Sequence, residues 1–252
     1  VESLEIAEAK YGSIVNKETK TAIKLSDKIS ALKIEVVELN KIKNVEQLSE
    51  TAKKLIQSIW LFNKYGYKED VITDDILKGL LVEQDSMGLA QSVLGGEFRV
   101  KNDEIKSNDW IIGCADTPLK KEDFIEDLKS NSNLRTYFEA SYKRCDRYWW
   151  QAQGYMWLWN KGNYRLIYCL VPTPEHQITS QKMKFYYKFN CDETNEDYIK
   201  ISMQVEHNNN LIKDIPERER VKVFTFPFEP EIIEMVKLKY KLALEYYNSL
   251  KL

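Results

Sequence analysis

Histidine and long apolar runs are both scarce in this sequence. His176 and His207 are the only histidines and lie far apart, which leaves little material for a histidine-rich metal site or for several histidine acid/base roles. We therefore expect carboxylates and lysines to carry most of the chemistry. No apolar run approaches the roughly 18 residues that a membrane span requires, so no membrane segment is expected. With 43% hydrophobic and 30% charged residues, the chain is expected to be globular rather than disordered.

Signals for export are also missing. The start VESLEIAEAK has neither the basic segment nor the apolar core of a secretion signal, and it lacks an initiator methionine, so we expect processing or an artificial chain start. The cysteines are widely spaced with no C-x-x-C pair, which argues against a zinc site and favours buried reduced thiols in a cytoplasmic protein. These cysteines are Cys114, Cys145, Cys169 and Cys191.

Neither sign of charge is in large excess. The 39 acidic and 37 basic residues give a net charge of −2, which excludes a mechanism that rests on global positive charge, such as coating nucleic acid. The net charge does not exclude a local basic groove. Glycine and proline are also few, 9 and 6, and there is no internal repeat and no obvious interdomain linker. We expect one domain over residues 1–252, with a helical extension at 1–70, a core at 74–172, and C-terminal helices and a strand at 173–252.

Hydrophobic periodicity predicts an α/β (α+β) chain with a small central mixed sheet flanked by helices. The first ninety or so residues have helical spacing, with breaks near Gly66 and before Asp74-Asp75, a pair that can cap a new helix. Thr117-Pro118 is expected in a turn. Further helices are predicted at 141–160, in two segments between about 175 and 207, and after Pro230; strands are predicted at 97–100, 109–116, 122–129, 163–174 and 220–228.

The stretch from 113 to 130 holds the most informative group of charged residues. Because side chains alternate along a strand, Asp127 and Lys129 share one face, and a hairpin would bring Asp116 beside them. Two adjacent carboxylates favour a hard divalent cation such as Mg²⁺ between them, and a nearby lysine can orient or help deprotonate water. Such a set suits hydrolysis of a phosphodiester. Alone the pattern is weak, because in a charged protein it more commonly reflects turn or surface carboxylates and a solvated lysine.

Two helical segments could contribute to the same chemistry. Gln151 and Tyr155 are four residues apart and face the same way, whereas Gln153 lies about 200° around the helix from Gln151. The tryptophans of this segment are compatible with packing as well as with base stacking. Upstream, Glu83 lies one helical turn after Gly79 on a face that is otherwise apolar. Burying an unpaired carboxylate is costly, so Glu83 is expected either to reach solvent or to meet a metal or cation.

The order of these motifs resembles the PD-(D/E)xK nuclease superfamily, and within it the lambda-exonuclease and YqaJ-type phage recombination nucleases, which are similar to the RecB nuclease domain. The resemblance spans roughly residues 74 to 172. It rests on K-G-x-x-x-E at 78–83, G-x-x-D at 113–116, I-x-D-x-K at 125–129 and Q-x-Q-G-Y-M at 151–156. The resemblance implies a restriction-endonuclease-like core and a Mg²⁺- or Mn²⁺-dependent nuclease.

The resemblance also implies roles for individual residues. Asp116, Asp127 and the Leu128 carbonyl would bind the metal, and Glu83 would complete or support the metal site. Lys129 would position the nucleophilic water. Gln151 and Tyr155 match the Q-x-x-x-Y helix motif, which would hold the lysine and the DNA end region. These expected site residues are Glu83, Asp116, Asp127, Leu128, Lys129, Gln151 and Tyr155.

A polyanionic substrate also requires a basic groove. The segment from Lys129 to Arg147 carries five basic and two acidic residues, a local charge of +3. We therefore expect Arg135, Lys143 and Arg147 to contact phosphates, although a solvated helix face would have the same composition.

We expect an exonuclease that acts on ends of double-stranded DNA in phage-type recombination or repair, in the cytoplasm of a phage-infected or bacterial cell. A single-strand annealing protein and further copies of this chain are expected as partners, by the same resemblance. Two alternatives stay open: a catalytically inactive DNA-binding or virion-associated protein with this fold, and an endonuclease of the same superfamily. The presence of all four of Glu83, Asp116, Asp127 and Lys129 favours a catalyst.

Overall fold

The computed structural model describes residues 2–14, 19–44, 47–69, 72–140 and 145–252. The chain divides into two compact units: Val1–Lys68 with Leu238–Leu252, and Glu69–Lys237. Among the described residues, no helix combines the length and the apolar character that crossing a bilayer requires. The expectation of one nuclease domain over the whole chain stays a prediction.

The first unit is helical. It holds α1 (Glu2–Gly12), α2 (Lys20–Asn44), α3 (Glu50–Tyr65) and most of α10 (Glu231–Ser249). The Ser49 side chain caps α3 by accepting a hydrogen bond from the backbone N–H of Ala52, and the helix ends at Gly66 in the left-handed region, which confirms the predicted break. Side-chain hydrogen bonds to two tyrosine hydroxyls of α10, from Gln57 to Tyr246 and from Asn63 to Tyr247, join it to α3.

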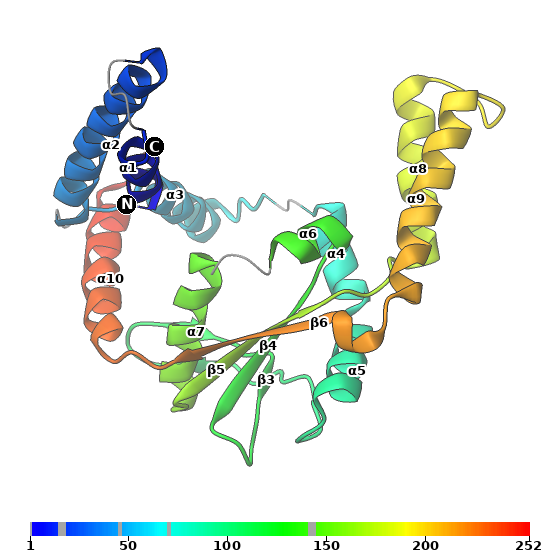
Figure 1. Cartoon of the computed structure of the whole chain (residues 1–252). Helices are drawn as coiled ribbons and strands as arrows, with labels where there is room; N and C mark the ends of the chain where they lie inside the picture. The colour runs from blue at the N-terminus through cyan, green and yellow to red at the C-terminus, as the bar shows by residue number, and fades with distance from the viewer. Residues whose placement is uncertain (1, 15–18, 45–46, 70–71, 141–144) are drawn as a thin grey trace. The chain divides into compact units, whose positions relative to one another are not determined.

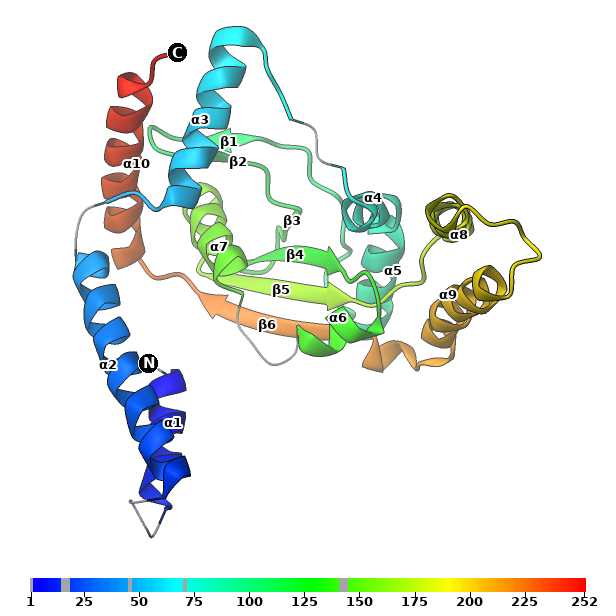
Figure 2. The same ribbon diagram turned by 90° about the horizontal axis from the view of Figure 1, so that it is seen from above.

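The second unit is built on a small mixed sheet, which confirms the predicted fold class. Its strand order is β3 (Thr117–Pro118), β4 (Phe124–Ser130), β5 (Asn163–Cys169) and β6 (Val221–Pro227). β4 and β5 are parallel and the outer pairs are antiparallel. Figures 1 and 2 show β4, β5 and β6 side by side. A separate short hairpin pairs β1 (Lys106–Ser107) with β2 (Ile112–Gly113).

Two apolar clusters cover the two faces of this sheet. On one face Tyr164, Leu166 and Tyr168 of β5 pack with the buried side of α7 (Asp146–Trp159), including Ala152 and Met156. On the other face the alternate residues Ile167 and Cys169 pack with Leu89 and Ala90 of α5 (Glu83–Leu94). Alternation along the strand therefore places α7 and α5 on opposite sides of the sheet. The remaining helices of this unit are α4 (Asp74–Leu81), α6 (Leu134–Glu139), α8 (Glu175–Phe189) and α9 (Glu196–Asp214), with a 3₁₀ turn at Glu217–Glu219.

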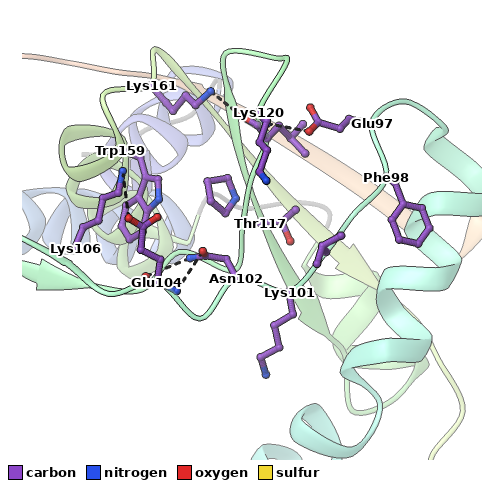
Figure 3. A pocket seen from close by; sticks show the side chains of 13 residues that line it. Glu97, Phe98, Lys101, Asn102, Glu104, Lys106, Thr117, Lys120, Trp159 and Lys161 are labelled. Atoms are coloured by element: carbon purple, nitrogen blue, oxygen red, sulfur yellow. Dashed lines mark hydrogen bonds and ion pairs between the residues drawn. The ribbon is translucent and has the colours of Figure 1, made fainter.

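Several predicted strands differ from the structure. The segment 97–100 is not a strand, because its backbone forms no ladder with another strand. The Glu97 carboxylate accepts hydrogen bonds from the backbone N–H groups of Lys120 (Figure 3) and Lys121. Of 109–116 only Ile112–Gly113 is a strand. The expected turn at Thr117-Pro118 is instead the edge strand β3, a position where proline's missing N–H is tolerated.

The predicted helices are largely confirmed, with differences at their ends. α4 is capped by the Thr73 side chain rather than by Asp74 or Asp75, and Val82 interrupts the helix that was expected to run through Glu83. The helix expected at 141–160 occupies Asp146–Trp159, and residues 141–144 lie outside the described part of the chain. α6 was not predicted. The cysteines are free thiols, but only Cys169 is fully buried.

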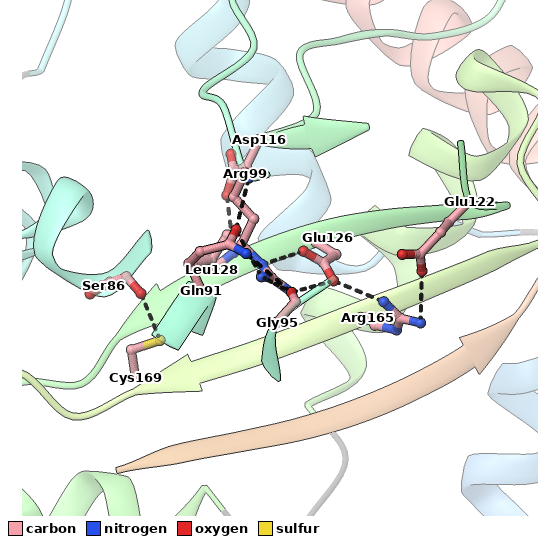
Figure 4. A network of polar contacts seen from close by, with 10 residues as sticks. All are labelled: Ser86, Gln91, Gly95, Arg99, Asp116, Glu122, Glu126, Leu128, Arg165 and Cys169. Carbon is pink, nitrogen blue, oxygen red and sulfur yellow. Dashed lines mark hydrogen bonds and ion pairs between the residues drawn. The ribbon is translucent and has the colours of Figure 1, made fainter. Parts of the chain in front are cut away.

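A buried ion cluster fixes the α5-facing side of β4. The Glu126 carboxylate, which has no exposed surface, accepts hydrogen bonds of 2.7 and 3.1 Å from Arg99 and one of 3.0 Å from Arg165 (Figure 4). Arg165 also reaches Glu122 at 3.2 Å. Because Arg99 comes from the segment before β1, this cluster ties that segment to the centre of the sheet.

We expect Glu126→Gln to destabilise the protein by about 3–5 kcal/mol, because the substitution leaves the buried Arg99 guanidinium without its countercharge. Urea unfolding of the wild type and the variant measures this difference. Glu139→Gln is the matched control, since Glu139 pairs with Arg135 on an exposed helix face and should change stability by less than about 0.5 kcal/mol. Equal effects of the two substitutions would contradict a structural role for the cluster.

Candidate active site

The carboxylate–lysine group predicted on β4 is assembled on the α7-facing side of the strand. Asp127 is fully buried, and Lys129 Nζ donates a 2.9 Å hydrogen bond to its Oδ1 and lies 2.7 Å from its Oδ2. Glu126, by contrast, lies on the other face, as strand alternation requires. Asp116, just before β3, accepts a 3.3 Å hydrogen bond from the Leu128 backbone N–H (Figure 4). The antiparallel pairing of β3 with β4 thus brings Asp116 to the same place as Asp127.

Burial raises the pKa of Asp127 to about 7, Lys129 opposes the rise, and the neighbouring Asp116 carboxylate adds to it. Burial also acts against the charged form of Lys129, but the Asp127 carboxylate outweighs it and raises the pKa of the lysine above its usual value. Lys129 is therefore protonated at neutral pH. Its ammonium group lies 5.1 Å from the ring centroid of Tyr148 on α7, a cation–π contact.

The α7 side of this site carries the predicted glutamine–tyrosine pair. Gln151 Nε2 donates a 3.0 Å hydrogen bond to the Tyr155 hydroxyl. Burial raises the pKa of Tyr155, and the charges of Asp127 and Asp116 add to the rise, which places the ring near both carboxylates. The ring packs so tightly on Gly113 that a Cβ there would lie 2.6 Å from it. The sequence offers a glycine at the one position where a side chain would displace Tyr155.

Gln153 has the separate role that its helical position predicts. It is fully buried, donates a hydrogen bond to the Pro227 carbonyl and accepts one from the backbone N–H of Glu229. It therefore fixes the end of β6 to α7 rather than entering the site.

Glu83 lies apart from the two aspartates. It is the first residue of α5, and its carboxylate forms a 2.5 Å ion pair with Lys101. The pKa of Lys101 is raised first by Glu83 and, to a smaller degree, by the charges of Asp103 and Asp116. Lys101 is thus a cation near both Glu83 and Asp116. Sequence spacing could not have found it, because it comes from the irregular segment that Arg99 anchors.

A cleft of about 470 Å³ opens beside these residues. Its lining includes Glu83, Lys101, Leu128, Lys129 and Tyr148. Asp127 itself has no exposed surface, whereas Lys129 lines the cleft. A ligand in this cleft would therefore meet Lys129 first.

The donor set fits a divalent cation, although within the described residues no three His, Cys, Asp or Glu side chains are grouped closely enough to hold a metal. Asp127 Oδ2 is buried and has no aligned hydrogen-bond donor in that part of the chain. A divalent cation shared by Asp116 and Asp127 would offset the carboxylate repulsion that helps to raise the pKa of Asp127. The third carboxylate, Glu83, is instead neutralised by Lys101.

Neither Arg135 nor Arg147, two of the predicted phosphate-contacting residues, lines the cleft. Arg135 is 87% exposed and forms an ion pair with Glu139 on α6, and Arg147 is exposed in the first turn of α7. Lys143 lies outside the described residues. Their role in DNA binding stays a prediction.

Comparison with solved structures shows which known proteins share this fold. A phage-related exonuclease from Haemophilus somnus 129PT is similar, with a TM-score of 0.63 and 23% identity over 81% of this chain and 83% of that one. The alkaline exonuclease LHK-Exo from Laribacter hongkongensis gives a TM-score of 0.55 at 10% identity, over 81% of this chain and 82% of the other. Its complex with dAMP gives 0.54, also at 10% identity, over 80% and 82%.

No protein-family model and no curated protein matches the chain. The structural likeness shows that the chain has the exonuclease fold, so the restriction-endonuclease-like core expected from the resemblance is confirmed. The roles of the individual site residues are not tested by a likeness at this level of identity.

Lys101→Met should raise the affinity of the protein for Mn²⁺ about tenfold, because the variant lacks the cation that neutralises Glu83 and lies near Asp116. Titration calorimetry without DNA measures this. Lys53→Met is a matched control, since Lys53 pairs with Glu50 at 2.7 Å in the other unit. An unchanged or weaker Mn²⁺ affinity in Lys101→Met would rule out competition between Lys101 and the metal.

Lys78 offers a test of how α4 is fixed to the end of β4. It is 3% exposed, and its ammonium donates hydrogen bonds to the Asn131 and Ser132 carbonyls. Burial lowers the pKa of Lys78 to about 8. Because the unfolded chain then binds more protons between about pH 8 and pH 10.4, Lys78 makes stability rise with pH across this window, by up to about 3 kcal/mol.

Lys78→Met should abolish this pH-dependent gain. The free energies of unfolding of the wild type and the variant, measured in urea at pH 8 and pH 10, give the difference. A parallel pH dependence in both proteins would show that Lys78 keeps an ordinary pKa in the folded state.

Proposed function

We propose that this protein is a Mg²⁺- or Mn²⁺-dependent deoxyribonuclease that hydrolyses DNA phosphodiester bonds, most specifically an exonuclease acting on ends of double-stranded DNA. The observation that carries the proposal is the buried Asp127–Lys129 pair beside Asp116. Three sequence-distant pieces, the end of the segment before β3, the strand β4 and the helix α7, contribute polar groups to this one place. The fold shared with two exonucleases supports the same conclusion.

Asp116, Asp127 and the Leu128 carbonyl would hold the metal, and Glu83 could join them once Lys101 turns away. A bound divalent cation supplies charge neutralisation at the phosphate and lowers the pKa of an attacking water. All other steps fall to side chains of the protein. Because Asp127 is buried and held by Lys129, its position is fixed before any substrate binds, and catalysis requires little rearrangement of this group.

Lys129 acts as an orienting cation. Its raised pKa means that it keeps its proton at neutral pH, so it donates hydrogen bonds to water or to a phosphate oxygen instead of accepting a proton from water. The Asp127 carboxylate and the Tyr148 ring hold the ammonium from two sides, which limits the directions in which its remaining hydrogens can point. A phosphate in the cleft would meet those hydrogens.

Tyr155 supplies a second donor. Since Gln151 donates its amide hydrogen to the Tyr155 oxygen, the phenolic hydrogen is free to point elsewhere. Its raised pKa keeps the phenol protonated. Tyr155 can therefore donate a hydrogen bond to substrate near the carboxylates, which gives a physical reason for the glutamine–tyrosine spacing.

The structure of LHK-Exo in complex with dAMP supports a deoxynucleotide substrate, because that protein shares the fold. The preference for DNA ends, the role in recombination, and partnership with an annealing protein or with further copies of this chain are part of the proposal through the same resemblance. Arg135, Lys143 and Arg147 are the residues proposed to contact the DNA backbone.

Asp127→Asn and Lys129→Ala should each reduce cleavage of end-labelled linear duplex DNA by at least about 10²-fold, because each removes one charge of the buried pair. The assay compares reactions with and without Mg²⁺ and includes closed circular DNA, which an end-dependent enzyme leaves intact. Lys200→Ala, on an exposed face of α9, is the matched control for the lysine.

Full activity in either site variant would refute the catalytic assignment. If the wild type binds DNA in a gel shift but leaves linear duplex intact with both Mg²⁺ and Mn²⁺, the fold serves binding alone and the proposed activity is wrong. Cleavage of the closed circle would contradict the requirement for an end.

A further inference from the structure

A second pocket, of about 560 Å³, lies beside the edge strand β3. Its walls are the irregular segment after α5, the turn that follows β3, and the end of α7 (Figure 3). The lining includes four lysines and two glutamates. Lys101 lines both this pocket and the cleft beside Lys129, so the two hollows meet at one cation.

The charges of this pocket are not all internally satisfied. The Glu97 carboxylate accepts hydrogen bonds from two backbone N–H groups of the β3–β4 turn. The Lys161 ammonium donates hydrogen bonds to the Leu119 and Glu122 carbonyls. Both residues therefore build the walls. Lys106 lies 4.0 Å from Glu104 and 5.3 Å from the centroid of the Trp159 ring, and Lys120 is exposed. Lys101 is paired with Glu83, so Lys106 and Lys120 are left to attract an anion.

Two residues that line the pocket hold buried polar atoms without a hydrogen-bond partner in the described part of the chain. These atoms are the Thr117 hydroxyl oxygen and the Trp159 indole nitrogen, on side chains that are 3% and 8% exposed. An unpaired buried donor lowers stability, and proteins rarely keep one without a reason. Here two occur in the wall of one lysine-rich pocket.

The chemistry of these groups selects an oxyanion. The indole N–H only donates, and a threonine hydroxyl can donate, so both can bind an acceptor oxygen. Lysine ammonium groups add positive charge to the same ligand. The Lys106 ammonium lies over the Trp159 ring, and its flexible side chain can turn toward an anion. At the rim, Phe98 is 75% exposed and offers an aromatic face on which a base can stack.

We propose that this pocket binds a phosphate of a single-stranded DNA segment that continues from the cleft past Lys101, with a base stacked on Phe98. This inference rests on the proposed nuclease function and deepens it by giving the strand a path outside the cleavage site. A positively charged groove with an exposed aromatic ring is the combination that single-stranded nucleic acid binds.

Thr117→Val separates binding from stability. Valine replaces the unpaired hydroxyl by a methyl group of similar size, so the melting temperature of the DNA-free protein should stay the same or rise by about 2–4 °C. In EDTA, which prevents cleavage, affinity for a fluorescent single-stranded oligonucleotide should fall about three- to tenfold. A lower melting temperature together with unchanged affinity would overturn the proposal, because the hydroxyl would then be structural.

The double variant Lys106→Met/Lys120→Met tests the charge. Loss of the one phosphate contact should reduce the salt dependence of oligonucleotide binding, expressed as the slope of log K against log salt, by about 0.7. Lys200→Met/Lys213→Met on α9 is the matched control and should leave this slope unchanged. Equal slopes in all three proteins would exclude the pocket as a strand site.

Competition with inorganic phosphate distinguishes a phosphate of a DNA strand from free phosphate as the ligand of the pocket. A pocket for a DNA strand predicts that oligonucleotide binding falls in the variants, while millimolar phosphate competes only weakly with it. Strong competition by phosphate, with oligonucleotide affinity unaltered in the variants, would mean a free-phosphate site and would overturn the strand path.

Metal-dependent cleavage of duplex DNA is measured on the same wild-type preparation. Cleavage with unaltered oligonucleotide binding in the variants rejects the pocket and leaves the nuclease proposal standing. Oligonucleotide binding that depends on the pocket, without any cleavage, rejects the nuclease proposal and leaves the pocket standing.

Discussion

The arrangement of this fold depends on charged side chains buried on both faces of one strand, β4. β4 carries Glu126 on the face toward α5 and Asp127 on the face toward α7, and both carboxylates have no exposed surface. Each is held by a basic partner: Glu126 by Arg99 and Arg165, Asp127 by Lys129. A buried carboxylate without such a partner would take up a proton or destabilise the fold. The positions of these cations are therefore as constrained as those of the apolar core.

The two pairs serve different ends. The Glu126 cluster is closed, because its guanidinium groups use the carboxylate fully and tie the segment around Arg99 to the sheet. The Asp127 pair is open, since one carboxylate oxygen lacks an aligned donor, Asp116 adds negative charge, and Lys129 lines a cleft. The closed Glu126 cluster stabilises the fold, whereas the charges of the open Asp127 pair can still interact with a ligand. The segment that Arg99 anchors also carries Lys101, so the closed pair helps to place a cation at the open one.

Much of the site could be predicted from local sequence. Strand periodicity alone puts Asp127 and Lys129 on one face, and helical periodicity puts Gln151 with Tyr155 while turning Gln153 away. These geometric expectations are confirmed because each involves residues on a single regular element. Asp116 required one further step, a hairpin. The strand that pairs with β4 is Thr117–Pro118, which was expected in a turn, and only Ile112–Gly113 of the strand expected over 109–116 is a strand.

The sequence by itself determined the periodic elements, the α/β class and which charged residues share a face, because these follow from local backbone geometry. The tertiary structure alone decided the pairing of Glu83 with Lys101, the break at Val82 and the loss of the expected strand at 97–100. Each depends on a partner distant in the chain or on irregular backbone. No periodicity links Arg99 to Glu126 or Thr117 to Trp159, since only the packing of the sheet against its connecting segments brings such groups into one place.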